Sequence, residues 1–251
     1  MTNPQIMMYS LWRNDEHRNI QARMRHLTDK TYGDLRWVWV CGDSSDATAD
    51  ILRDFAEEMR YHDGLDITVV EHFTGIEGMD HYSRLLRLSA SCSEAVAQTR
   101  ESDDYIVVHE SDLQSPPDLI EQFLATGKDY VAGATWLDLT EGRVFYDVWA
   151  FYRNGKRFSN GEPYHRDWTD DELLEVDSFG SCWMVPAAPF FGPNGIRVKY
   201  DAAREMCGRL KRRDPSARFW LAPWIEIVQP RELWEPHDLS VEDMEATTWD
   251  K

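Results

Sequence analysis

Short apolar runs alternate with amphipathic segments along the first half of the chain. Four runs have the length and composition of buried strands: residues 6–11, 35–43, 66–73 and 104–110. Three segments with apolar residues at helical spacing separate them: residues 15–30, 44–62 and 82–100. Strands that alternate with helices predict a largely parallel central sheet with helices on both faces.

The second half of the chain is less regular. Its pattern predicts helices at 118–127 and 201–213, and strands at 129–137, 173–186 and 218–228. Residues 138–172 form a polar, aromatic-rich stretch with turn residues, and no repeat or linker divides the sequence. We therefore predict one α/β domain, followed by an acidic tail at 231–251.

The composition supports a folded domain and excludes some classes of partner. Hydrophobic residues make up 42% of the 251 positions and aromatic residues 12%, which is enough for a substantial core. The formal net charge of −18 argues against nonspecific coating of nucleic acid or of an anionic membrane. A basic run at residues 209–213 leaves room for a local anion-binding patch, or is simply a solvated helix face.

Cysteine usage and the N-terminus indicate an intracellular protein. The four cysteines show no paired spacing, so the sequence suggests neither a zinc ribbon nor a disulfide framework. The first residues lack a basic region followed by an apolar stretch, and Pro186, Pro189 and Pro193 interrupt the later apolar runs. We expect a soluble, cytoplasmic protein with buried, reduced thiols.

Polar segments follow three of the predicted strands. They are residues 12–14, 42–45 and 110–112. Because the carboxyl ends of parallel strands meet at one edge of a sheet, and ligands bind there, we expect these segments to form a binding site.

Glu110, Ser111 and Asp112 form an acidic turn, a name used below for residues 110–112. Two acidic residues spaced one apart should occur by chance roughly eight times in so acidic a chain. Carboxylates at a strand exit can bind a divalent cation, which in turn neutralises a diphosphate. Alternatively, Asp112 or Ser115 caps the helix after the proline pair. The residues alone leave both interpretations open.

Two stretches resemble a known family. "DYIVVHESDL" is similar to the segment that ends in the Asp-x-Asp motif of GT-A glycosyltransferases of the family 2-like group, and "WVWVCGDSSDATADIL" is similar to their second strand and capped helix. The resemblance implies a GT-A (Rossmann-like) fold, and a site in which Asp43 contacts the base or ribose of a nucleotide sugar. It also implies that Glu110 and Asp112 bind Mn2+ or Mg2+, with Asp112 the safer ligand and Ser111 a spacer.

The second half resembles a narrower group. The motifs "YDVWAF", "LLEVDSFGSCWMV", "YDAAREMCGRLKRR" and "FWLAPWIEIVQP" follow the order seen in the Golgi mannan-polymerase mannosyltransferases and their soluble bacterial and phage relatives. The resemblance implies catalytic roles for Asp201, our first candidate for the base that activates the acceptor hydroxyl, and for Asp177. Asp201 could instead cap a helix, and Asp177 could instead bond a loop.

One position departs from the family pattern. Many GT-A enzymes place a metal-binding His after the last strand, where this chain has Gln229. Either Gln229 or His237 then completes the metal shell.

Further candidate residues for donor binding lie near the acidic turn. Arg84 and Arg87 are three apart on a predicted helix, where one of them meets the diphosphate or holds Asp43, or both pair with surface acids. Trp12, with Arg13 beside it, either stacks on the nucleobase or belongs to the core.

We also predict an acceptor-binding set. Tyr146, Asp147 and Trp149 combine aromatic faces with a carboxylate, as sugar sites do, although a strand of alternating burial would give the same pattern.

The sequence thus favours a metal-dependent glycosyltransferase that moves a hexose from a UDP- or GDP-linked donor to a hydroxyl of a soluble macromolecule. Residues 1–115 would bind the nucleotide sugar and 116–230 the acceptor. The resemblance implies two acceptors: hydroxymethylated pyrimidine in phage DNA, or Ser and Thr of a virion protein. One alternative is a nucleotidyltransferase, against which the absence of glycine in "SLWRNDEHRN" argues. The other is an inactive nucleotide- or carbohydrate-binding module.

Overall fold

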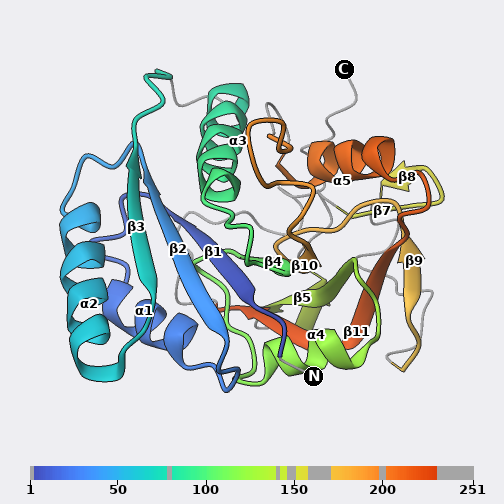
Figure 1. Ribbon diagram of the computed structural model, residues 1–251, viewed down its shortest axis with the longest axis horizontal. Coiled ribbons are helices and arrows are strands. Elements are labelled where there is room, and N and C mark those ends of the chain that lie inside the picture. Colours follow the sequence, from blue (N-terminus) through green and yellow to red (C-terminus); the bar gives the residue numbers. More distant parts are fainter. Residues whose placement is uncertain are drawn as a thin grey trace.

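A mixed β-sheet crosses the middle of the molecule, with helices on both faces (Figure 1). The computed structural model describes residues 3–77, 81–139, 142–145, 151–157, 171–197 and 202–230. Within these ranges the sheet has nine strands, in the order β3-β2-β1-β4-β10-β5-β11-β9, with β6 paired to β5. The predicted α/β class with a mostly parallel central sheet is confirmed.

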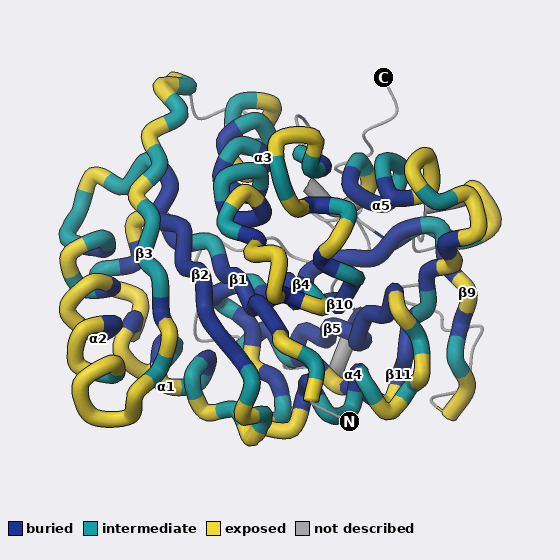
Figure 2. The backbone as a smooth tube through the Cα atoms, in the orientation of Figure 1, coloured by how far each residue is buried: buried dark blue, intermediate teal, exposed yellow. Residues whose placement is uncertain are grey.

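The N-terminal half supplies four adjacent parallel strands. These are β1 (Ile6–Trp12), β2 (Leu35–Gly42), β3 (Ile67–His72) and β4 (Tyr105–His109). All eight residues of β2 are buried, as are six of the seven of β1. Figure 2 shows β1 and β2 as largely buried, whereas β3, at the edge of the sheet, is mostly of intermediate exposure. Parallel strands covered on both faces must be apolar throughout, and such runs of apolar residues can be predicted as strands from the sequence.

The C-terminal half extends the sheet with strands of both directions. They are β5 (Val131–Leu139), β6 (Gly142–Phe145), β9 (Leu174–Val176), β10 (Cys182–Pro186) and β11 (Phe219–Gln229). A separate hairpin pairs β7 (Tyr152–Arg153) with β8 (Lys156–Arg157). Strand β10 runs antiparallel to both of its neighbours, β4 and β5, while β5 and β11 are parallel to each other.

The single strand predicted at 173–186 is wrong. The structure has two strands there, and they lie far apart in the sheet: β9 pairs with β11 at the edge, and β10 lies between β4 and β5. The intervening residues 177–181, Asp-Ser-Phe-Gly-Ser, are mostly polar or flexible, and Asp177 and Ser178 bond to Tyr152 instead of to a sheet neighbour. These residues interrupt the ladder, so the two apolar ends are free to join different strands.

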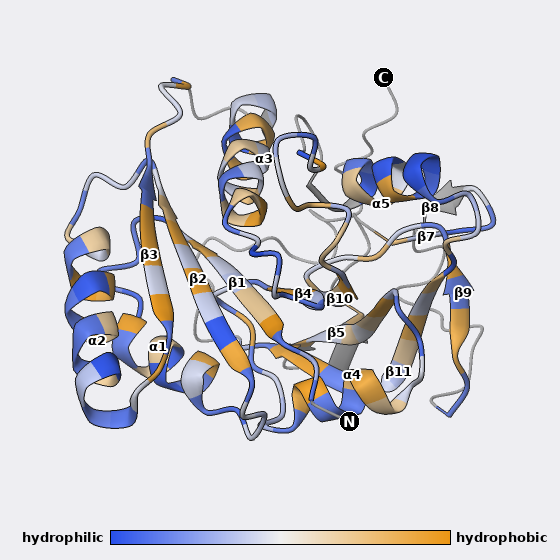
Figure 3. Ribbon diagram, in the orientation of Figure 1, coloured by the Kyte–Doolittle hydropathy of each residue, from blue (hydrophilic) through white to orange (hydrophobic). Residues whose placement is uncertain are grey.

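Helices cover the two faces of the sheet unequally. One face packs against α1 (Ile20–Thr28), α2 (Thr48–Asp63) and α4 (Leu119–Ala125). The other packs against α3 (His81–Ala97) and α5 (Ala202–Arg213). Figure 3 shows hydrophilic residues on the outer faces of α2 and α5. In the described part of the chain, no helix combines the length and apolarity needed to cross a bilayer.

Two local features determine where α1 begins and how closely α3 packs against the sheet. Helix α1 begins five residues later than predicted, because residues 15–19 form a turn that ends at Asn19 in a left-handed conformation, with φ of +54°. Helix α3 approaches the end of β2 closely, since a Cβ at Gly42 would lie 2.4 Å from Ser91 Oγ. A larger residue at position 42 would push α3 away from the sheet.

Candidate functional site

The carboxyl ends of β1, β2 and β4 lie side by side, as the parallel register requires. The predicted polar segments therefore share one edge of the sheet. The end of β11 joins them, because Val228 exchanges two backbone hydrogen bonds with Gln114, just after the acidic turn. This edge is the candidate site.

The exits of β1 and β2 are held by polar contacts. Asn14 and Asp43 each follow a strand in a left-handed conformation, with φ of +50° at both positions. Asn and Asp tolerate this conformation better than most residues. The backbone N–H of Asn14 donates to Ser44 Oγ at 3.1 Å, and the backbone N–H of Ser45 donates to Asn14 Oδ1 at 2.9 Å. The two loops therefore fix each other.

Asp43, predicted to contact the base or ribose, is oriented by Thr74. Its Oδ1 accepts the backbone N–H of Thr74 at 2.8 Å, and its Oδ2 accepts the Thr74 hydroxyl at 2.6 Å. A carboxylate oxygen has more than one lone-pair site, so this partly exposed side chain can still accept from a ligand.

The two arginines of α3 have different environments. Arg84 is exposed, whereas Arg87 is only 6% exposed. Arg87 Nη1 donates to the backbone carbonyl of Ile76 at 3.1 Å, and the Ile76 N–H donates to Thr74 Oγ1 at 3.1 Å. Arg87 thus supports the segment that orients Asp43. This contact is compatible with the prediction that one of the two arginines holds Asp43, here through Ile76 and Thr74, and the role stays a prediction.

Trp12 lies in the core. Its side chain is 2% exposed and packs against Trp39, with ring centroids 5.7 Å apart. A ring this buried offers no open face to a nucleobase, so the core interpretation of Trp12 accounts for the structure. Arg13, beside it, is exposed, and its backbone N–H donates to Asp15 Oδ2 at 2.9 Å.

Arg23, on α1, is a site residue that the sequence interpretation missed. Its Nε and Nη2 donate to the backbone oxygen and the hydroxyl of Ser111, at 2.9 and 2.7 Å. Its Nη1 donates to Asp15 Oδ1 at 2.8 Å, and its guanidinium lies 4.9 Å from the ring centre of Trp12. In the sequence, Arg23 is one of several basic residues on an amphipathic helix, and nothing in the spacing separates it from the others.

The two carboxylates of the acidic turn have different neighbours. Glu110 lines a small cavity, of about 40 Å³, between β1, β4, β10 and α3, whose other lining residues include Tyr9, Cys92 and Trp183. Asp112 Oδ2 instead accepts the Gln229 amide N–H at 3.1 Å. Burial raises the pKa of Asp112, and the positive charge of Arg23 opposes this effect.

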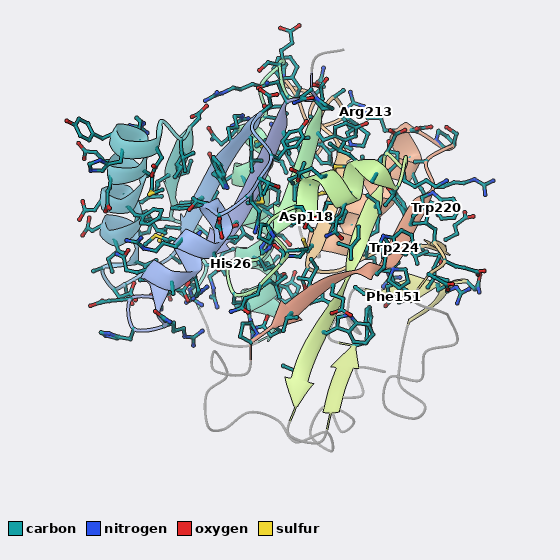
Figure 4. The ribbon with its side chains drawn as sticks, turned by 90° about the horizontal axis from the view of Figure 1, so that it is seen from below. His26, Asp118, Phe151, Arg213, Trp220 and Trp224 are labelled. Carbon is teal, nitrogen blue, oxygen red and sulfur yellow. The ribbon has the colours of Figure 1, made fainter. Side chains whose placement is uncertain are left out.

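A buried hydrogen-bond network supports the acidic turn from beneath. His109 is fully buried; its Nδ1 lies 2.8 Å from the Glu110 backbone oxygen and its Nε2 lies 2.8 Å from Ser115 Oγ. The backbone N–H of Ser115 donates to His26 Nε2 at 2.8 Å (His26 is labelled in Figure 4). Because the contact of Nδ1 within the described residues is with a carbonyl oxygen, which can only accept, we assign the proton of neutral His109 to Nδ1. The sequence interpretation treated His109 only as the end of a strand.

Burial keeps both imidazoles neutral. Burial, and after it the nearby Lys30 ammonium, lower the pKa of His109 from 6.5 to about 3. The same two causes, burial first, lower the pKa of His26 to about 4. The network therefore consists of neutral hydrogen bonds over the physiological range of pH.

Asp177, the second catalytic candidate, has structural contacts. Its Oδ2 accepts the backbone N–H of Gly155 at 2.6 Å in the turn between β7 and β8, and Lys211 Nζ lies 3.8 Å from its Oδ1. These contacts match the alternative in which Asp177 bonds a loop. Its catalytic role remains a prediction. The other predicted residues of the second half lie outside the described residues: Tyr146, Asp147, Trp149, Asp201 and His237.

The described residues offer few protein ligands for a metal. Among them, no three His, Cys, Asp or Glu side chains gather in a way that could hold an ion. Gln229 is 2% exposed, and in the described structure its Oε1 has no hydrogen-bond partner, although its Nε2 bonds Asp112. A buried acceptor without a partner, next to the partly buried carboxylate of Asp112, is the feature here that fits a cation best.

The fold matches that of a glycosyltransferase. The chain aligns with GalNAc-T7, solved with UDP, GalNAc and Mn2+, at a TM-score of 0.60 and 10% sequence identity. The alignment covers 94% of this chain and 45% of that chain, so this chain spans less than half of that protein. At this identity the likeness establishes the fold, and it confirms the GT-A architecture expected from the sequence.

Other comparisons add little. The mannosyltransferase PcManGT from Pyrobaculum calidifontis, in complex with GDP-Man and Mn2+, aligns over 53% of this chain and 36% of that chain, at 19% identity and a TM-score of 0.38. This score is too low to support an argument. No family model and no curated protein sequence matches the chain.

Proposed function

We propose that the protein is a glycosyltransferase that moves a hexose from a nucleotide sugar, UDP- or GDP-linked, to a hydroxyl of a macromolecule. The observation that carries this proposal is the shared edge of β1, β2 and β4, where Asp43 and the acidic turn follow the strands of a GT-A fold. In open α/β sheets, ligands bind at this edge. The Asp43 carboxylate, oriented by Thr74, suits the base or ribose, and Glu110 faces the adjoining cavity.

The oxygen donors of this edge fit a divalent cation, Mn2+ or Mg2+. Asp112 and Gln229 would hold it; Glu110, whose side chain lines the neighbouring cavity, stays the second carboxylate that the sequence predicts. Such hard cations bind oxygen ligands and often use only one or two carboxylates, with substrate phosphates completing the shell. When bound, the cation would neutralise the charge that develops on the departing diphosphate. The raised pKa of Asp112 and the unpartnered Gln229 Oε1 both indicate a site that gains stability from a positive charge.

For activation of the acceptor hydroxyl we retain Asp201 as the proposed base. An inverting transfer needs a carboxylate within hydrogen-bond reach of the hydroxyl. Asp177 is the weaker candidate, because its described contacts already account for it. Tyr146, Asp147 and Trp149 remain the proposed acceptor-binding residues.

The basic end of α5 gives little support to a DNA acceptor. Arg209 bonds Glu205 within the helix, at 2.8 Å. Arg213 donates to the backbone oxygens of Pro189 and Asn194, at 2.9 and 3.2 Å, and lies well away from His26 in Figure 4. Lys211 lies near Asp177. Because these side chains serve intramolecular contacts, we favour a protein Ser or Thr hydroxyl over a hydroxymethylated base.

A donor screen tests the proposal. UDP- and GDP-hexoses would be incubated with Mn2+, with and without protein and hydroxymethylated-DNA acceptors, and the released nucleoside diphosphate measured. We expect release with at least one donor, and its loss in Asp112→Asn. Asp118→Asn, an exposed carboxylate nearby, should retain activity.

The other outcomes identify the alternatives. Release of pyrophosphate from a nucleoside triphosphate would indicate a nucleotidyltransferase. Binding of a nucleoside diphosphate without any turnover would indicate an inactive module. Full activity in a folded Asp112→Asn protein would contradict the metal assignment. Transfer of the hexose to hydroxymethylated DNA would contradict the preference for a protein acceptor.

A further inference from the structure

Arg23 connects the acidic turn to the loop that follows β1. Each of its three guanidinium nitrogens has a hydrogen-bond acceptor within 2.9 Å: two bonds go to Ser111 and one to Asp15. The central carbon of the group lies over the ring of Trp12, 4.9 Å from its centre. The Arg23 side chain is 10% exposed and that of Asp15 is 7% exposed, so this is a nearly buried ion pair.

The geometry fixes the middle of the acidic turn. Because the planar guanidinium bonds both the backbone oxygen and the hydroxyl of Ser111, it restrains the peptide plane as well as the side chain. On the other side, Asp15 uses its second oxygen to accept the backbone N–H of Arg13. The loop after β1 and the acidic turn are thus held to the same arginine. A rotation at Ser111 would break two bonds at once.

This contact matters for the two carboxylates, since they flank Ser111 and point to different neighbours. Glu110 faces the cavity beside Tyr9, and Asp112 faces Gln229. A shift of the backbone at residue 111 would therefore move both side chains. Lysine could not replace the contact, because an ammonium is a point charge and cannot bond this set of acceptors in one plane.

We propose that Arg23 is a positioning residue for donor binding, which sets the acidic turn against the loop after β1 and so sets the affinity for a nucleoside diphosphate with Mn2+. This inference rests on the proposed function, which supplies the ligand. Arg23 contacts neither donor nor acceptor in this scheme; it acts through Ser111 and Asp15.

The test compares Arg23→Lys with Arg25→Lys, an exposed arginine on the same helix. Affinity would be measured by calorimetry with UDP and with GDP, each in the presence of Mn2+. Outer partners of a metal site change affinity by about 10- to 100-fold, so we expect Arg23→Lys to bind about tenfold more weakly. Arg25→Lys should bind as the unaltered protein does.

A second readout needs no ligand. The amide of Leu113 donates to the Glu110 carbonyl at 3.2 Å within the turn, and its hydrogen exchange reports the order of residues 110–113. We expect faster exchange there in Arg23→Lys, with unchanged exchange in β4. Ser111→Ala, which removes one bond but leaves the Arg23–Asp15 pair, should change exchange in the same direction by a smaller factor.

The affinity and exchange measurements distinguish a failure of the Arg23 role from a failure of the proposed function. Unchanged exchange at Leu113 together with unchanged affinity in Arg23→Lys would overturn the positioning role, as would faster exchange with unchanged affinity. If the unaltered protein binds neither nucleotide, the proposed function fails at that step, and the donor-binding role fails with it. The exchange measurement then still decides whether Arg23 orders the turn.

Discussion

The buried imidazole of His109 should make the protein sensitive to acid in a defined window of pH. The ring is fully buried and bonded on both nitrogens, and burial lowers its pKa from 6.5 to about 3. In the unfolded chain the ring takes up a proton near pH 6.5, whereas in the folded protein it does not until about pH 3. The unfolded state therefore binds more protons between these values, and stability falls as the pH falls.

The size of the effect follows from the two pKa values. Each pH unit over which the unfolded chain holds one more proton than the folded protein lowers the stability by about 1.4 kcal/mol. Between pH 7 and pH 5, the unfolded imidazole is protonated over about 1.5 pH units, those below its pKa of 6.5. His109 should therefore cost about 2 kcal/mol of folding free energy over this interval. That is a large part of the stability of an ordinary domain.

The assay is urea unfolding at pH 7 and at pH 5, for the unaltered protein and for His109→Asn. Asparagine retains a polar side chain but takes up no proton in this range, so the variant should be less stable at pH 7 yet lose about 2 kcal/mol less on acidification. His17→Asn is the matched control, because the side chain of His17 is 88% exposed. This control should keep the pH dependence of the unaltered protein.

The comparison isolates His109 from the many carboxylates, since these are the same in every variant. If His109→Asn loses as much stability between pH 7 and pH 5 as the unaltered protein does, the buried imidazole is not the acid-sensitive group. An equal effect of His17→Asn would show that exposed histidines account for the dependence.

Three further predictions concern packing and the site. Asp103→Ala removes the partner of the buried Arg36, with which it forms two hydrogen bonds, and should cost about 3–5 kcal/mol in urea unfolding. Gly42→Ala places a Cβ 2.4 Å from Ser91 Oγ and should cost about 1–3 kcal/mol, measured in the same way. Thr74→Val removes the hydroxyl that orients the carboxylate after β2, and should weaken nucleotide binding several-fold in calorimetry while stability changes little.

Each of these has a control within the chain. Asp66→Ala breaks an exposed ion pair and should cost less than about 1 kcal/mol, so equal effects at positions 66 and 103 would contradict the burial argument. Ser91→Ala, combined with Gly42→Ala, removes the clashing Oγ and should restore most of the lost stability; no recovery would mean that the clash is elsewhere. For Thr74, the control is Thr99→Val, a buried threonine just beyond the C-terminus of α3, which should leave nucleotide binding unchanged.

The N-terminal half of the sheet was predictable because burial on both faces demands uninterrupted apolar strands. Residues 35–43 and 104–110 have this pattern, and the structure places β2 and β4 within one or two residues of the predicted bounds. The common edge of their carboxyl ends then follows from the parallel direction. The sequence predicted the position of the acidic turn for the same reason.

What the sequence could not predict depends on contacts between distant segments. The apolar residues of 173–186 are compatible with one strand or two, and only pairing with β4, β5 and β11 decides between them. Arg23 lies 88 positions from Ser111, and its role depends on how α1 is rotated against the sheet. Likewise, the divergence of Glu110 and Asp112 is set by neighbours on β10 and β11 that local spacing does not encode.

The placement of β10 has a consequence for any attempt to divide the protein. This strand comes from the second half of the chain, yet it pairs with β4 along its whole length, and the Glu110 N–H donates to the Ser181 carbonyl at 3.3 Å. A fragment of residues 1–115 would leave β4 as an unpaired edge in a strongly apolar sheet, and such edges recruit strands from other molecules. The predicted donor-binding half (residues 1–115) and acceptor-binding half (residues 116–230) are therefore not separable modules. A transplant of the first half onto another protein of this fold would have to carry β10 along with β1 to β4.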